Sequence, residues 1–582
     1  MRNNLKLDAS NIGAIVNADD YQSYDLVFEN ITVVDVIAHE LRQANVAIRQ
    51  GHIAYVGNEA CHAKHTIDGT GKFLSPGFMD SHVHVESSML SLPEFARAVL
   101  PHGTTAVFGD PHEIANVLGR RGVELFLQDD PDLPFRYFLQ VPSRVPTAKG
   151  LEGTGGELTV DDTIALLDHK STVSLGEIPV SLLMDPSMNV DLFEKIAAAH
   201  TRHKLINGHA PAVDQELGAF LASGINDDHT CIDLEDGIEK VRAGIWIMIK
   251  ESSLDKNLDK LYPLLQRYPH RVNLCCDDVD PVDLAHEGHM DHRLRRAIAL
   301  GVEPVNAYMA ATFTTAQRHH LEEFYGSITP GKVADLVVLS DLEQVAVDQV
   351  WIDGELVVDQ GDVIKAIQPW QLPEWATHTV NLPPITSETF LTAADEDQVV
   401  RVINLIPGAG PRNRGTEEKL AVNDGYLVIH GDINYLTAIN RHGKSQHASA
   451  FVRGFSIKGG AVASSIAHDH HNLMVVGDNP RSMLIAAKEI EKMQGGLAVV
   501  NGIQVAAAMP LTIAGLMSER SLHEVVEDLE ACIAAAASLG CELESPFMSL
   551  SFVGLPSMPE YGLTDVGLVY VSQNSLVPVV IE

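Results

Sequence analysis

Two histidines that stand one residue apart, His82 and His84, constrain this chain more than any other feature. In a β-strand, side chains at positions i and i+2 point to the same face, so both imidazoles can reach one cation from the end of one strand. A helix would need the spacing i, i+4 instead. Chance pairs occur in a chain with 27 histidines, but the surrounding Pro-Gly-x-x-Asp-x-His-x-His frame of residues 76–84 is much more specific.

Length and composition indicate a multidomain globular protein. The chain has 582 residues, which predicts two to four domains, and its 45% hydrophobic and 20% charged residues are typical of globular chains. No stretch approaches the roughly 18 to 20 apolar residues of a membrane span. Residues 1–6 lack the apolar core of a signal peptide. We therefore expect a cytoplasmic protein without a membrane partner.

Charge and cysteine usage exclude several classes of function. The formal net charge is −37, which repels nucleic acid and anionic lipid and favours a neutral or cationic small substrate. The six cysteines include no Cys-x-x-Cys pair, which argues against a structural zinc site and a secreted disulfide scaffold. The same absence excludes the Pro-Cys-x-x-Cys signature of the cytidine-type zinc deaminases.

The order of predicted elements suggests several domains. Residues 24–73 read as short strands, and residues 75 to about 325 alternate strands and helices, the pattern of a parallel α/β sheet. About 250 residues is the usual size of a (β/α)8 barrel, whose chemistry lies at the carboxyl ends of its strands. A proline-rich stretch over 369–384 marks a linker, and residues 385–582 read as a further α/β domain.

Titratable residues follow the predicted barrel strands in order. Glu177 follows a strand at 173–176, where a charge is costly unless it is paired or bound to metal. His209 follows a strand at 205–208, and Asp227, Asp228 and His229 follow the next strand, one βα unit later. Asp277 and Asp278 follow the last strand, and only one of two neighbouring residues can point into the barrel mouth.

These motifs resemble the amidohydrolase superfamily, and the segment 82–89, His-Val-His-Val-Glu-Ser-Ser-Met, resembles its adenine deaminase branch. The resemblance implies an α/β fold: a (β/α)8 TIM-like barrel with a small composite β-sandwich domain and an additional C-terminal α/β domain. The implied boundaries are 1–75 plus 326–368 for the sandwich, 76–325 for the barrel, 369–384 for the linker and 385–582 for the C-terminal domain.

The same resemblance implies a binuclear metal centre. Glu177 would bridge the two ions, where many relatives carry a carboxylated lysine, and His229 would help to stabilise developing charge. Asp277 would bind metal and act as general base, with Asp278 as the alternative. Imidazole and carboxylate ligands suit zinc, manganese or iron, and the resemblance favours manganese or iron. The implied metal ligands are His82, His84, Glu177, His209, His229 and Asp277.

Two further clusters are candidates for substrate contact. One, after the second strand, is Asp110, His112 and Glu113, which are either substrate or auxiliary metal contacts or parts of a structural loop. Glu86 and Glu251 are weaker candidates for binding purine nitrogens. The other cluster, His468-Asp469-His470-His471, is either a lid that reaches the barrel mouth of its own or a neighbouring subunit, or a polar network inside its domain.

The expected function is therefore metal-dependent hydrolytic deamination of adenine to hypoxanthine and ammonia in purine salvage, by a homo-oligomer of two or more chains. Adenine and water are the expected partners, with no nucleic acid. Two alternatives stay open: another amidohydrolase that acts on a cyclic amide or aminated heterocycle, and a non-enzymatic protein that kept the barrel as a scaffold. The Glu177 in place of lysine, the extra domain and the complete ligand set argue against both.

Overall fold

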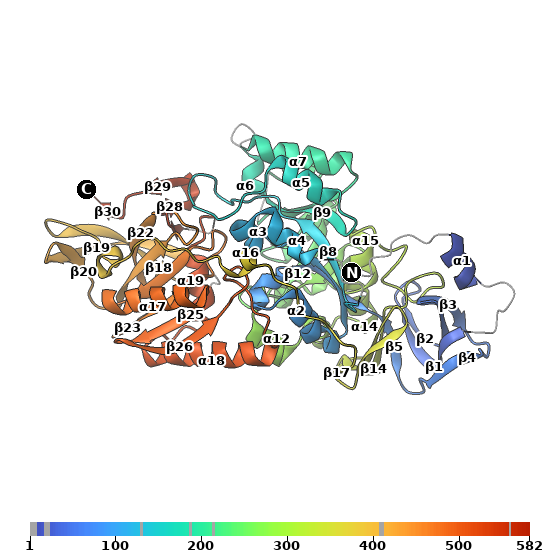
Figure 1. The fold of residues 1–582 in the computed structure, drawn as a ribbon. Helices are drawn as coiled ribbons and strands as arrows, with labels where there is room; N and C mark the ends of the chain where they lie inside the picture. Colours follow the sequence, from blue (N-terminus) through green and yellow to red (C-terminus); the bar gives the residue numbers. More distant parts are fainter. Residues whose placement is uncertain are drawn as a thin grey trace.

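The computed structural model describes residues 9–16, 24–128, 132–184, 189–211, 216–406, 412–557 and 560–581. Parts of the predicted N-terminal domain, residues 1–8 and 17–23, lie outside the described residues. The chain is laid out in three parts along one direction (Figure 1). An N-terminal sheet lies at one end, a barrel occupies the centre, and a large C-terminal α/β part lies at the other end.

The centre of the described chain is a closed ring of eight parallel strands. Five strands pair in the order β10-β9-β8-β7-β6 and three in the order β11-β12-β13. β10 lies beside β11, and an isolated parallel bridge from Val83 to Asp277 joins the first strand to the last. The expectation of a TIM-like barrel is therefore confirmed. The strands are β6 (Phe78–Val83), β7 (Thr104–Gly109), β8 (Arg136–Val141), β9 (Thr172–Pro179), β10 (Leu205–His209), β11 (Asp227–Asp228), β12 (Trp246–Lys250) and β13 (Val272–Cys275).

Burial on both faces explains the composition of these strands. Every residue of β6, β7 and β8 is buried, because side chains on one face fill the barrel and those on the other face meet the outer helices. The connecting and flanking helices include α2 (Leu92–Val99), α3 (His112–Leu118), α4 (Arg120–Phe126), α5 (Val160–Leu167), α7 (Val190–Thr201), α8 (Glu216–Ala222), α9 (Leu234–Arg242), α10 (Leu258–Leu261), α11 (Pro263–Arg267), α12 (Pro281–Glu287), α13 (Met290–Ala299), α14 (Pro304–Ala310) and α15 (Phe313–Arg318).

The sixth strand differs from the sequence prediction. Asp227 and Asp228 were expected to follow this strand, but they form it. Both carboxylates are fully buried, and each has a cationic partner from a helix: Asp227 pairs with Arg318 at 2.5 Å, and Asp228 pairs with Lys240 at 2.8 Å. A strand of two aspartates carries no apolar pattern, so periodicity could not locate it.

One nine-stranded sheet combines segments from before and after the barrel. β5 (Phe73–Pro76) pairs antiparallel with β14 (Leu336–Asp341), which brings together residues about 260 positions apart. The sheet order is β17-β16-β15-β14-β5-β1-β2-β3, with β4 beside β1. Its other strands are β1 (Tyr24–Asp35), β2 (Glu40–Arg49), β3 (His52–Gly57), β4 (Ala63–Asp68), β15 (Ala346–Ile352), β16 (Glu355–Asp359) and β17 (Asp362–Val363).

The C-terminal part is built on a ten-stranded sheet. Its order is β20-β19-β18-β22-β21-β24-β23-β25-β26, with β30 beside β18, and α17 (Pro480–Met493) and α18 (Leu522–Ser538) contact its strands. A small sheet of β27 (Tyr561–Thr564), β28 (Gly567–Tyr570) and β29 (Ser575–Val577) lies beside it. The strands of the large sheet are β18 (Gln398–Leu405), β19 (Asn413–Asn423), β20 (Tyr426–Val428), β21 (Ile433–Ile439), β22 (His447–Arg453), β23 (Gly460–Ser464), β24 (Leu473–Gly477), β25 (Gly496–Asn501), β26 (Gln504–Pro510) and β30 (Val580–Ile581).

The C-terminal part is packed firmly against the barrel. Backbone hydrogen bonds join Ser91 to Ser518 and Ser518 to Met89, at 2.9 and 2.8 Å. One buried hydrophobic cluster runs without a break from the barrel strands into residues 403–568. The proline-rich stretch is also packed, since α16 (Glu374–Thr377) contains the buried Ala376. In the described part of the chain, no helix combines the length and apolar character that would be needed to cross a bilayer.

This shared core predicts that the barrel and the C-terminal part unfold together. Separating them would expose the apolar surface that now fills the contact between them, which is unfavourable in water. We expect a single cooperative transition for the intact chain in differential scanning calorimetry, with calorimetric and van't Hoff enthalpies that agree. Two well-separated transitions, one of which survives removal of residues 385–582, would contradict this expectation.

Candidate metal centre and its surroundings

The mouth of the barrel gathers the predicted metal ligands. In a barrel of parallel strands all carboxyl ends meet at one face, so residues that follow different strands become neighbours. Five of the six predicted ligands are buried, and the His209 side chain retains 30% of its surface. The structure therefore brings together His82, His84, Glu177, His209, His229 and Asp277.

The first group of ligands joins the first and last strands. Asp277 Oδ1 lies 3.5 Å from His82 Nε2 and 3.2 Å from His84 Nε2. The other ring nitrogens are held from behind, His82 Nδ1 by Gln140 Oε1 at 2.7 Å and His84 Nδ1 by the carbonyl of Asp110 at 2.8 Å. Metal-binding histidines commonly have such partners, which fix the ring and direct the free nitrogen at the ion.

Asp277, and not Asp278, faces these histidines. Lys250 Nζ lies 3.0 Å from Asp277 Oδ2, while Asp278 Oδ1 accepts a hydrogen bond from Ser87 at 2.5 Å. Burial opposes ionisation of Asp277, but Lys250 and the two histidines outweigh it and hold the pKa of this carboxyl well below its ordinary value.

The second group surrounds Glu177, a residue of β9. Glu177 Oε2 lies 3.0 Å from His209 Nδ1 and 3.1 Å from His229 Nε2, and Arg144 donates to Glu177 Oε1 at 2.9 Å. Burial again opposes ionisation, but the histidines and Arg144 keep the pKa of Glu177 well below its ordinary value. Glu177 also lies within 4.8 Å of the ligand atoms of His82 and His84, so its carboxylate stands between both groups.

The donor set fits divalent cations. His82 Nε2 is buried and has no hydrogen-bond partner among the described residues, which is costly unless a cation or water occupies the space that it faces. Imidazole nitrogens and carboxylate oxygens without thiolate are the ligands of zinc, manganese and iron sites. Two groups of nitrogens that share one carboxylate match a binuclear arrangement.

A second cluster lies beside the first and includes residues of the C-terminal part. His112 stacks edge-on to His84, with ring centroids 4.5 Å apart. Asp469 Oδ1 lies 3.3 Å from His112 Nε2, and His468 Nδ1 lies 3.5 Å from Glu113 Oε1. The first two residues of the 468–471 cluster, His468 and Asp469, therefore contact the barrel mouth of their own chain.

The other two residues of this cluster, His470 and His471, lie in different surroundings. His470 Nε2 hydrogen-bonds to the carbonyl of Gly554, inside the C-terminal part. His471 Nε2 lies 3.8 Å from Glu113 Oε2 and has no hydrogen-bond partner in the described chain. Thr147 donates a hydrogen bond to Asp469 at 2.6 Å. Burial acts to raise the pKa of Asp469, but His112 and Arg144 outweigh this effect and hold the pKa well below its ordinary value.

Glu86 and Glu251 lie in different surroundings. Glu86 is buried beside Glu113, and burial followed by the Glu113 charge raises the pKa of Glu86 to about 8. Its Oε2 atom has no hydrogen-bond partner in the described residues. Glu251, by contrast, accepts a hydrogen bond from the backbone of Leu258 and pairs with Arg296 at 3.3 Å, so its carboxylate supports the helices behind β12.

Sequence reasoning missed two cations at the barrel mouth, Lys250 and Arg144. Lys250 is the last residue of β12, and Arg144 follows β8. Their only sequence signal is a position at or just beyond the carboxyl end of a barrel strand. Arg144 is also the link between the two clusters, because its guanidinium contacts Glu177 and, at 3.4 Å, Asp469.

Two family profiles match this chain. The sequence profile of the amidohydrolase family matches residues 73–357, and that of the adenine deaminase C-terminal domain matches residues 413–575. A solved structure, an adenosine deaminase from Xanthomonas campestris with bound zinc, is similar at 17% identity and a TM-score of 0.46, covering 59% of this chain and 95% of that chain. The profile match over residues 73–357 identifies an amidohydrolase domain, and the amidohydrolase family is metal-dependent.

Relatives that match nearly the whole chain identify a particular branch of this family. Adenine deaminase of Desulforamulus reducens is 39% identical over 568 residues, 96% of each chain. The enzymes of the same name from Dehalococcoides mccartyi strain CBDB1 and Methanothrix thermoacetophila are also 39% identical, covering 95% and 96% of this chain and 96% and 97% of theirs. The chain belongs to the adenine deaminase family.

The position of Glu177 predicts its effect on metal content. Glu177→Ala removes a carboxylate that stands between both ligand groups, so we expect elemental analysis to find clearly less divalent metal than in the wild-type protein. Asp278→Asn is the matched control, because that carboxylate bonds to Ser87 and leaves the histidines untouched. Equal metal content in the Glu177 variant and the wild type would show that Glu177 is not a ligand.

Proposed function

We propose that this protein hydrolyses adenine to hypoxanthine and ammonia on two divalent ions, with manganese or iron favoured and zinc as the third candidate. The observation that carries the proposal is the shared carboxylate of Glu177 between two histidine groups, with Asp277 directed at one of them. Full-length relatives named adenine deaminase support the choice of substrate.

The chemistry divides between the ions and the side chains. Divalent cations, when bound by these ligands, lower the pKa of water and stabilise developing negative charge. Asp277 would accept one proton from the attacking water as C6 of adenine becomes tetrahedral and pass it to the ring nitrogen. It would then take the second proton from the new C6 hydroxyl and pass it to the departing amine. The ion pair of Lys250 with Asp277 Oδ2 keeps Oδ1 directed at the histidines during these transfers. His229 helps to stabilise the charge that develops at C6.

The second cluster is proposed to hold the purine. Its groups lie next to His84 and face the same barrel mouth, and the unpartnered Oε2 of Glu86 is available to a ring nitrogen. The net charge of −37 favours a free base over a nucleotide. The proposed substrate contacts are Glu86, Asp110, His112, Glu113, Asp278, His468 and Asp469.

The two alternatives have less support. A hydrolase of cyclic amides would not explain the C-terminal domain that matches the adenine deaminase profile. A scaffold protein would not explain a buried and complete ligand set. Six free cysteines support a cytoplasmic location, where disulfides are rare. The role in purine salvage and the homo-oligomeric state stay predictions.

The direct test is ammonia release from metal-loaded protein across a panel of purines, pyrimidines and cyclic amides. We expect adenine to be the best substrate. Asp277→Asn should keep the fold and lower the turnover rate at least ~10²-fold, the usual scale of general acid–base catalysis, while Asp278→Asn should lower it less. A cyclic amide as best substrate would overturn the substrate assignment, and full activity of the Asp277 variant would move the base elsewhere.

The contacts of Asp469 predict that the C-terminal part contributes to turnover. Asp469→Asn removes the charge that faces His112 and Arg144, and Arg144 in turn orients Glu177, so we expect kcat to fall by about tenfold or more, as for other groups that support metal ligands. Asp565→Asn is the control, because the hydrogen-bond partners of this buried aspartate among the described residues are Gly153, Asn440 and Asn472. An Asp469 variant with unchanged kcat would restrict the cluster to a structural role.

A further inference from the structure

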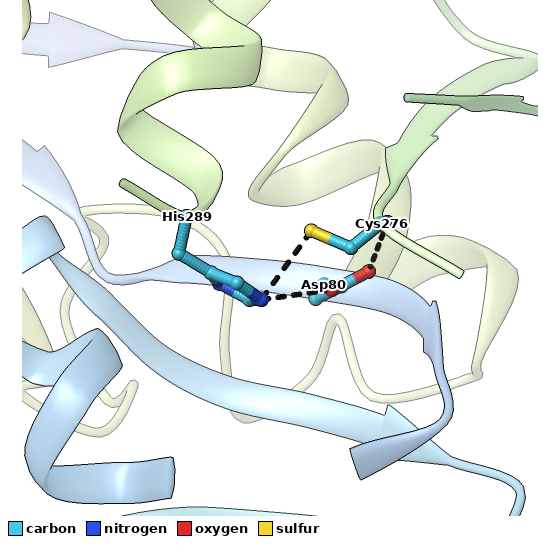
Figure 2. Close-up of side chains that lie close together, drawn as sticks. All are labelled: Asp80, Cys276 and His289. Atoms are coloured by element: carbon cyan, nitrogen blue, oxygen red, sulfur yellow. Dashed lines mark hydrogen bonds and ion pairs between the residues drawn. The ribbon is translucent and has the colours of Figure 1, made fainter. Parts of the chain in front are cut away.

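A cluster of three side chains lies beneath the metal centre and takes no part in the reaction described above. Asp80 belongs to β6, Cys276 directly follows β13, and His289 precedes α13. All three are completely buried. Figure 2 shows the imidazole and the thiol directed at each other, with the Asp80 carboxylate beside them.

One oxygen of Asp80 ties together the two strands that close the barrel. Asp80 Oδ1 accepts hydrogen bonds from the backbone N–H of His82, at 3.3 Å, and from that of Cys276, at 3.1 Å. His82 is itself a proposed ligand, and Cys276 immediately precedes the proposed ligand Asp277. A single carboxylate oxygen therefore fixes the backbone at the two points from which ligands of the same group arise.

Few other hydrogen bonds join these two strands. Beyond Asp80, the described residues supply bonds from Asp277 N–H to the His82 carbonyl at 3.0 Å, from His84 N–H to the Asp277 carbonyl at 3.2 Å and from Asn273 Nδ2 to Ser81 Oγ at 3.2 Å. The pairing is an isolated bridge, and Asp277 has a φ of 59°, in the left-handed region. The left-handed conformation costs a residue other than glycine roughly 1 kcal/mol. Neighbouring contacts must therefore hold the backbone of Asp277 in place.

The second oxygen of Asp80 is held through His289. Asp80 Oδ2 has no hydrogen bond within the described chain, but it lies 3.3 Å from His289 Nε2. The same nitrogen lies 3.3 Å from Cys276 Sγ, and His289 Nδ1 lies 2.9 Å from Thr104 Oγ1 of β7. The imidazole thus braces the carboxylate against the neighbouring strand.

We propose that Asp80 is a positioning residue that holds His82 and Asp277 at the distance a shared cation needs, with His289 as its brace. The proposal rests on the metal centre proposed above. Groups that orient ligands typically change metal affinity or activity by about 10- to 100-fold when they are removed. We expect Asp80→Ala to weaken metal binding on that scale, although Asp80 touches neither the ions nor adenine.

The test compares full-length variants that differ only in which contacts of Asp80 survive. Asp80→Ala loses both oxygens, while Asp80→Asn keeps an oxygen that can accept from the two backbone N–H groups. Asp335→Asn is the control, because Asp335 is a buried carboxylate paired with Arg136 at the start of β8, the end of the barrel opposite the metal centre. Manganese affinity is measured by competition with a chelator, and the melting temperature is measured on the metal-free proteins.

The expected order of manganese affinity is wild type, then Asp80→Asn, then Asp80→Ala, with Asp335→Asn equal to the wild type even where its melting temperature falls. Wild-type affinity in both Asp80 variants would overturn the proposal. So would an equal loss of affinity in the Asp335 control, since that would trace the effect to general instability. If Asp80→Ala does not fold, the Asp80→Asn comparison decides alone.

Cobalt substitution tests the rival interpretation that the three side chains themselves bind a metal. The proposed centre contains no thiolate, so a thiolate-to-cobalt charge-transfer band in the wild type that Cys276→Ser abolishes and Cys275→Ser leaves unchanged would overturn the positioning role. Absence of the band supports it. Failure of the proposed function can be told apart from failure of this proposal. A wild-type protein that binds two ions but deaminates no purine would contradict the proposed function, while the comparison of manganese affinities would still test the role of Asp80.

Discussion

The structure depends on the pairing of two buried carboxylates, Glu177 and Asp277, with imidazole, amino and guanidinium groups from several strands. An unpaired carboxylate in a barrel interior costs several kcal/mol, and the cost is recovered only when partners lie at hydrogen-bond distance. Two histidines and Arg144 surround Glu177, and two histidines and Lys250 surround Asp277. The need for such partners therefore places residues from the ends of seven strands around one point, which is also the arrangement that divalent ions need.

The C-terminal part completes this arrangement. Arg144 contacts both Glu177 and Asp469, so the ligand that stands between the two groups is connected through one guanidinium to a residue about 300 positions away. His468 and Asp469 extend the polar surroundings of the mouth without contacting the proposed ligands directly. The C-terminal part thus supplies a carboxylate that contacts the arginine beside Glu177.

Much of the site was predictable because barrels impose a simple rule. Once strands at 104–108, 136–141, 173–176, 205–208, 246–249 and 272–276 are recognised from their apolar runs, titratable residues just beyond them must converge. The rule failed where a strand carries no apolar pattern, as for Asp227 and Asp228, whose burial depends on Arg318 and Lys240. It also failed for Glu251, which follows β12 but turns away to Arg296.

The residue types and their order follow from the amino-acid sequence alone: the His-x-His pair, Glu177, the two later histidines and the Asp277–Asp278 pair. Local periodicity ties most of them to a strand, and His229 is the exception because its strand carries no apolar pattern. Only the tertiary structure decided which aspartate faces the histidines, because a left-handed backbone at Asp277 and the Ser87 contact of Asp278 depend on closure of the barrel. Only the tertiary structure brought Lys250, Arg144 and Asp469 to the mouth. Contacts between residues hundreds of positions apart leave no periodic signal, since they arise from the packing of complete elements.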